Sequence, residues 1–121
     1  DRLSYIGSIG HMPKAWARLL GERARERQVM TVIYSYNTPI AWLDSIHGWI
    51  IPDVSYSVTT SVKHQSQLHR LHGRKISAPW DAKPEDMRRV LDGRMMFVRA
   101  GKWGTGDYAG TRPGPNYVAG E

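Results

Sequence analysis

The chain has 121 residues, 40% of them hydrophobic and 23% charged, which is typical of a globular protein with one modest core. It contains no cysteine, which excludes disulfides, thiolate nucleophiles and cysteine-based zinc sites. No apolar run approaches the roughly 20 residues that a membrane helix needs. We therefore expect a soluble protein without a membrane span, and the cytoplasm is its simplest location.

The net charge is +6, which favours acidic partners such as phosphate backbones, anionic lipids or an acidic protein face. Residues 1–29 hold six basic and three acidic residues, and the other 92 hold eleven and eight. Each part therefore contributes +3, and the first is the more densely basic. Gly10-His11-Met12 is a sequence that a cloning junction often leaves, so residues 1–11 are either an addition to the natural chain or a truncated natural segment.

A helix is expected over residues 13–28, because Pro13 suits a first helical position and Trp16, Leu19 and Leu20 share one face. The opposite face carries lysine and arginine partly balanced by glutamates. This basic face is interpreted as a solvated surface, with an arm for nucleic acid or membrane as the alternative.

The pattern then changes to β-branched and aromatic residues, which favour strands. Short strands are expected over 31–36, 40–43, 49–51 and 54–59. Ser61 is a candidate N-cap for a helix over about 62–72 that stops at Gly73. Further along, we expect a strand over 75–78, a helix that begins at Pro84 and stops at Gly93, and a strand over 95–99.

These elements predict an α+β fold, in which a small antiparallel sheet of four to five strands packs against two short helices. A basic helix precedes this core, and an extended tail follows it. The predicted organisation is a leader over 1–29, a core domain over 30–100 and a Gly/Pro-rich tail over 101–121, where Trp103, Tyr108 and Tyr117 are expected anchors. The predicted core residues are Ile33, Ile40, Trp42, Trp49, Ile51, Val54, Tyr56, Val58, Leu68, Leu71, Met87, Val90, Leu91, Phe97 and Val98.

No motif in the chain indicates catalysis. His64, His69 and His72 fall in one expected helix but converge poorly, and that helix offers no carboxylate as a further metal ligand. The hydroxyl-rich stretch 55–61 contains no Gly-x-Ser-x-Gly elbow, and the glycines of 101–106 lack the spacing of a phosphate-binding loop. We therefore predict a non-enzymatic protein with no catalytic residue, cofactor or metal.

Basic residues and tryptophans are the most plausible binding groups. They suit a protein interface, where tryptophan and arginine are common hot spots, and this is the favoured interpretation. The alternative is a nucleic-acid binder, since such residues also contact phosphates and stack on bases. An exposed edge strand also makes a homodimer reasonable. The predicted binding residues are Trp80, Arg88, Arg89, Trp103, Arg70 and Arg74.

Two segments together resemble a known family. Tyr34-Ser35-Tyr36-Asn37-Thr38-Pro39-Ile40-Ala41 and Tyr56-Ser57-Val58-Thr59-Thr60-Ser61-Val62-Lys63-His64-Gln65 are similar to the signature of small uncharacterised proteins of actinobacteriophages, of the mycobacteriophage type. The resemblance implies a phage-encoded, non-virion protein that binds a host bacterial protein inside the infected cell. It carries no catalytic residue with it. The signature residues are Tyr34, Tyr36, Thr38, Pro39, Thr59, Thr60, Ser61, His64 and Gln65.

Overall fold

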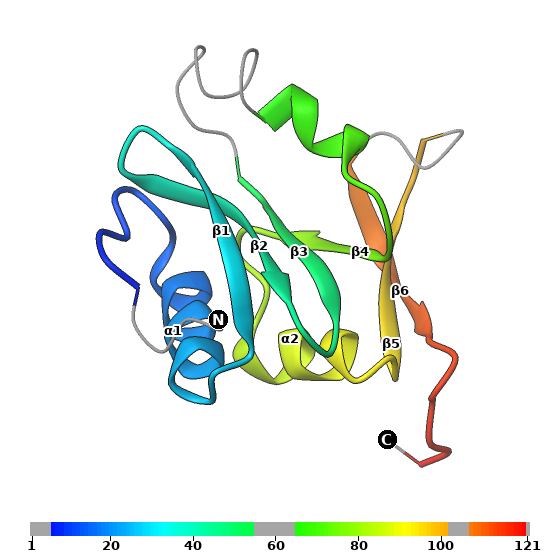
Figure 1. The fold of residues 1–121 in the computed structure, drawn as a ribbon. Helices are drawn as coiled ribbons and strands as arrows, with labels where there is room; N and C mark the ends of the chain where they lie inside the picture. Colours follow the sequence, from blue (N-terminus) through cyan, green and yellow to red (C-terminus); the bar gives the residue numbers. More distant parts are fainter. Residues whose placement is uncertain (1–5, 55–64, 102–106, 121) are drawn as a thin grey trace. The chain divides into compact units, whose positions relative to one another are not determined.

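The computed structural model describes residues 6–54, 65–101 and 107–120 (Figure 1). The chain divides into two units, residues 1–81 and residues 82–121. This division differs from the expected boundaries after residues 29 and 100.

A four-stranded sheet forms the first unit (Figure 1). β1 (Val29–Ser35), β2 (Thr38–Asp44) and β3 (Gly48–Asp53) make an antiparallel meander, as expected. β4 (Lys75–Pro79) then pairs with β3 in parallel. The protein therefore has the predicted α+β fold, but its main sheet is mixed rather than wholly antiparallel. The 21 residues between β3 and β4 allow this arrangement, because a parallel pair needs a crossover of about a dozen residues or more.

Helix α1 (Lys14–Arg25) belongs to the first unit and buries Trp16, Leu20 and Ala24. These residues are spaced by four and so form one stripe. The Trp16 ring meets Trp42 of β2 edge to face at 6.2 Å, and its indole N–H donates to the carbonyl of Pro79, 3.2 Å away. The tryptophan predicted on the helix face therefore ties α1 to both β2 and β4.

Helix α1 ends three residues earlier than expected. Arg27 adopts a left-handed conformation with φ of 59°. The Arg27 amide donates to the Ala24 carbonyl, and the Gln28 amide donates to the Arg23 carbonyl. This is a Schellman motif, and its left-handed position is usually glycine. Arginine at that position hid the helix end from the sequence pattern.

The expected helix over 62–72 is shorter and tighter in the described residues. Residues 65–70 form the 3-10 helix η2 (Gln65–Arg70), and Leu68 is buried in a cluster with Ile40 and Ala41. Gly73 has φ of +96°, which agrees with its predicted role as a left-handed stop. The expected strand over 54–59 and Ser61 lie almost wholly outside the described residues.

The second unit contains α2 (Pro84–Leu91), β5 (Met95–Arg99) and β6 (Tyr108–Pro113) (Figure 1). The α2 helix begins at Pro84 and ends before Gly93, whose φ is +76°, as predicted. β6 corrects the prediction of an extended tail, because it pairs antiparallel with β5. The Tyr108 ring packs edge to face on the Phe97 ring, with the ring centroids 5.9 Å apart. The Arg99 guanidinium lies 4.2 Å from the centroid of the Tyr108 ring. These contacts hold the returning strand.

Six predicted core residues are buried: Ile40, Trp42, Leu68, Met87, Val90 and Leu91. Most of the others are half-buried, and Tyr56 and Val58 lie outside the described residues. The core also includes residues that were not predicted, among them Val29, Ala41, Ile50 and Ile76. No helix among the described residues has the length and apolarity to cross a membrane.

Candidate binding surfaces

Two tyrosines form what we call the hairpin surface: Tyr34 near the end of β1 and Tyr36 in the turn between β1 and β2. Ser35 pairs with Thr38, so Tyr36 and Asn37 alone form the loop. Tyr36 is 75% exposed and has φ of 56°, while Tyr34 is 41% exposed. A bulky residue with positive φ is uncommon, and glycine usually takes this place in a two-residue hairpin loop. The turn therefore holds a large aromatic ring in solvent at a cost in backbone strain.

The segment before α1 supports this turn. The His11 amide donates to the Thr38 hydroxyl over 3.0 Å, and Thr38 is 5% exposed. A side chain at Gly10 would place its Cβ 2.8 Å from the Asn37 carbonyl oxygen. Thr38 and Pro39 are thus buried and structural, whereas Tyr34 and Tyr36 are exposed to solvent.

A second surface, the basic segment, runs over residues 70–80. Its three positively charged side chains, Arg70, Arg74 and Lys75, are exposed, and so is His72. Trp80 follows β4 and is 60% exposed. The Trp49 amide donates to the Arg74 carbonyl over 2.9 Å, and Leu71 packs against the cluster around Leu68. The backbone is therefore anchored while the charged side chains face water.

In the second unit, an open hollow of about 390 Å³ is lined by Pro84, Glu85, Arg88, Arg89 and Arg94. It brings together two of the predicted binding residues. However, Arg89 pairs with Asp86 at 3.0 Å and Arg94 pairs with Asp92 at 3.1 Å. With Glu85 on the rim, three carboxylates oppose three guanidinium groups. The hollow is therefore close to electrically neutral.

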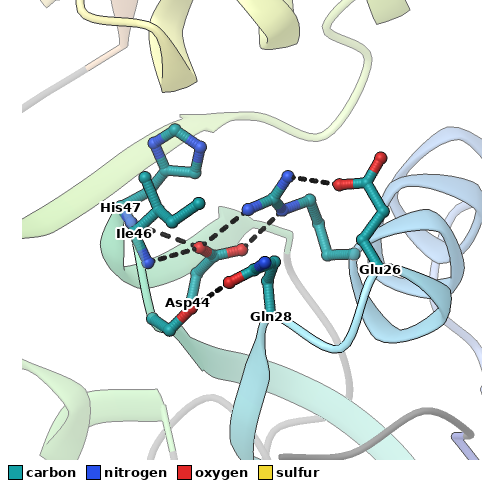
Figure 2. A network of polar contacts seen from close by, with 7 residues as sticks. Glu26, Gln28, Asp44, Ile46 and His47 are labelled. Atoms are coloured by element: carbon teal, nitrogen blue, oxygen red, sulfur yellow. Dashed lines mark hydrogen bonds and ion pairs between the residues drawn. The ribbon is translucent and has the colours of Figure 1, made fainter.

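A polar network surrounds Asp44 in the first unit (Figure 2). The Asp44 side chain is fully buried, and Arg23 of α1 donates to its two oxygens over 2.7 and 3.1 Å. The amides of Ile46 and His47 donate to the same carboxylate over 2.9 and 3.2 Å. Arg23 also pairs with Glu26, and the Ser45 hydroxyl bonds the Gln28 side chain (Figure 2).

This network is structural rather than reactive. Burial raises the pKa of Asp44. The hydrogen bonds from Arg23 and from the amides of Ile46 and His47, together with the positive charge of Arg23, lower it by more, so the pKa lies below its usual 3.8. An ionised carboxylate with four donors has little capacity left to accept a proton from a substrate. The network instead locks α1 to the turn between β2 and β3. A lone aspartate before a turn is a known signal for such amide capping, which the sequence reasoning did not use.

The predicted binding residues fall into separate places. Arg70, Arg74 and Trp80 belong to the first unit, and Arg88 and Arg89 to the second. Trp103, Thr59, Thr60, Ser61 and His64 lie outside the described residues, and Gln65 begins η2. Within the described ranges, no three histidine or acidic side chains come together as a metal site. The hairpin surface was not predicted, although a polar Asn37 between two strand patterns indicates a tight turn.

By fold, this is a small α+β protein built on a mixed four-stranded sheet. The chain belongs to a family of unknown function, DUF8033, whose model matches residues 10–82. The match nearly coincides with the first unit and contains the hairpin surface and the basic segment. No curated protein and no solved structure matches the chain.

Proposed function

We propose that this chain is a non-enzymatic, phage-encoded binding protein that acts on a host protein in the cytoplasm of the infected bacterium. The hairpin surface is its contact site. The phage origin and host direction rest on the family resemblance of the two sequence segments. The place of contact rests on the geometry of the first unit.

The observation that carries the proposal is the conformation of Tyr36. A left-handed backbone costs an L-residue about 1 to 2 kcal/mol, and strained positions of this kind concentrate at functional sites. Tyr36 is 75% exposed, so most of its ring area is open to contact with another molecule. Tyrosine is well suited to a contact surface, since it offers a large apolar area at a low cost in side-chain entropy.

Replacement of Tyr36 by glycine tests the proposal, because it removes the ring while it relieves the strain. Immobilised protein is exposed to a nuclease-treated mycobacterial lysate, the host class that the resemblance implies. We expect the wild type to retain one host protein, and Tyr36→Gly to retain it at least about tenfold less, as for a hot-spot residue. Arg27→Gly is the matched control, since it relieves similar strain at the end of α1 and should bind like the wild type.

Three results would overturn the proposal. The first is equal retention by the Tyr36→Gly and Arg27→Gly variants. The second is retention of no protein above the level of a blank matrix. The third is association of the chain with itself through the tyrosines, measured by analytical ultracentrifugation, which would make the hairpin surface a homodimer interface.

A further inference from the structure

We propose that the basic segment is a binding track for single-stranded nucleic acid. Arg70, Arg74 and Lys75 contact successive phosphates, and Trp80 stacks on a base. This surface does not depend on the hairpin surface and would serve the chain whether or not a host protein is bound.

The first support is the distribution of charge. Residues 70–80 contain Arg70, Arg74 and Lys75 and no aspartate or glutamate, so these 11 residues contribute +3 of the net +6, and the nearest acidic residues along the sheet, Asp53 and Asp81, lie at the Trp80 end of β4. On α1, by contrast, Glu22 and Glu26 accompany the basic residues, and Arg23 is already paired with Asp44. The hollow beside α2 is nearly neutral. Positive charge is therefore less compensated in the basic segment than on α1 or in the hollow beside α2.

The second support is rigidity. Leu68 is 6% exposed and fixes η2 on the sheet, Gly73 turns the chain toward β4, and the Arg74 carbonyl accepts the Trp49 amide. Gly48 lies so close that its Cβ would stand 2.7 Å from the Arg74 carbonyl oxygen. A surface whose backbone is already ordered loses less entropy when it binds.

The third support is spacing. β4 is extended from Lys75 to Pro79, and a strand rises about 3.3 Å per residue, so about 13 Å separate these two residues, and Trp80 follows the strand in a turn. Lys75 and Ser77 are exposed along this strand, whereas Ile76 and Ala78 are buried. The charged residues and the indole thus lie at opposite ends of β4. An exposed indole favours single strands, because bases in a duplex are already stacked.

The test is fluorescence anisotropy of the full chain with labelled oligothymidylate and oligouridylate of about 12 nucleotides, and with a duplex of equal length. We expect both single strands to bind at low salt. The ratio of the two affinities shows whether DNA or RNA is the preferred ligand. Three phosphate contacts predict a slope of about −2 for log K against log salt. The duplex should bind several-fold more weakly.

Two variants separate the contributions. The triple variant Arg70→Gln, Arg74→Gln, Lys75→Gln should lose most of the salt dependence and at least tenfold in affinity. Trp80→Ala should lose about tenfold in affinity with the salt slope unchanged, since stacking releases no counterions. The matched control is Lys14→Gln, Arg18→Gln, Arg25→Gln on exposed positions of α1, which lowers the net charge from +6 to +3 equally. The circular dichroism spectrum and thermal midpoint of each variant confirm that it is folded.

The proposal fails if neither single strand binds at low salt. It also fails if the two triple variants lose equal affinity, because binding would then follow net charge alone. Duplex binding as tight as single-strand binding, with no effect of Trp80→Ala, would also contradict it. Tyr36→Gly should bind oligonucleotides like the wild type, so the failure of either proposal leaves the other standing.

Discussion

At the scale of single residues, Tyr36 and Arg27 both adopt left-handed backbone conformations that favour glycine, with φ of 56° and 59°. Arg27 closes the end of α1 through two backbone hydrogen bonds. Tyr36 closes a two-residue hairpin and exposes its ring. The left-handed conformation thus ends a helix at Arg27 and exposes an aromatic side chain at Tyr36.

Glycine at position 27 should stabilise the fold slightly. Relief of about 1 to 2 kcal/mol of left-handed strain exceeds the extra entropy of about 0.5 to 1 kcal/mol that glycine loses on folding. We expect Arg27→Gly to raise the free energy of unfolding by about 0.5 kcal/mol, measured by urea denaturation. Arg27→Ala, which keeps a Cβ, should show no gain. A lower midpoint for Arg27→Gly would contradict the strain argument.

Replacement of Asp44 should have a large effect on the stability of the fold at neutral pH. Asp44→Asn leaves Arg23, whose side chain is only 14% exposed, without its buried counterion. Loss of one partner of a buried pair should cost about 3 kcal/mol of stability at pH 7. Asp92→Asn is the matched control, because its pair with Arg94 is more exposed and its loss should cost about 1 kcal/mol or less. Equal losses in the two variants would contradict the burial argument.

The same aspartate sets part of the acid stability. Because the folded pKa of Asp44 lies below 3.8, its contribution is complete above that value and is lost as the pH falls through the lowered folded pKa. Urea midpoints measured between pH 7 and pH 2 should fall less in Asp44→Asn than in the wild type. A parallel fall in both proteins would show that Asp44 does not contribute to acid unfolding.

At the scale of elements, the sequence predicted what depends on local pattern. Runs of β-branched and aromatic residues predicted β1 to β3, and Pro84 with Gly93 bounded α2. The sequence pattern did not predict the features that depend on pairing between separate strands. The return of β6 to β5 rests on the contacts of Tyr108 with Phe97 and Arg99, which lie nine to eleven residues away in a glycine-rich context. The parallel pairing of β4 likewise depends on a crossover that no local period encodes.

Packing of α1 on the sheet predicts a difference between neighbouring leucines. Leu20 is fully buried, whereas Leu19 is half-buried. Leu20→Ala should cost about 3 kcal/mol of unfolding free energy, because it leaves a cavity beneath the helix. Leu19→Ala should cost clearly less, and both are measured by chemical denaturation. If Leu19 proved the more costly, the burial of α1 on its Trp16 face would be wrong.

At the scale of the whole molecule, the two units differ in how well each can sustain a fold. The largest fully buried side chains among the described residues include Trp16, Leu20, Val29, Ile40, Trp42 and Ile50, and all six belong to the first unit. The family match ends within one residue of the unit boundary. The second unit has 40 residues, with one short helix and a two-stranded sheet, a size and architecture that are marginal without further support.

We therefore expect a fragment of residues 1–81 to fold alone and a fragment of residues 82–121 not to. The first fragment contains Trp16, Trp42, Trp49 and Trp80, so its near-ultraviolet circular dichroism and its urea transition report on the sheet core directly. It should unfold cooperatively and keep the near-ultraviolet signal of the Trp16 and Trp42 pair, which Trp16→Phe should remove. The second fragment should show no cooperative transition, since hairpin contacts such as Tyr108 on Phe97 do not build a core large enough to offset the entropy of ordering 40 residues. An unfolded first fragment would mean that the family segment is not an independent folding unit and that its core depends on residues beyond Asp81.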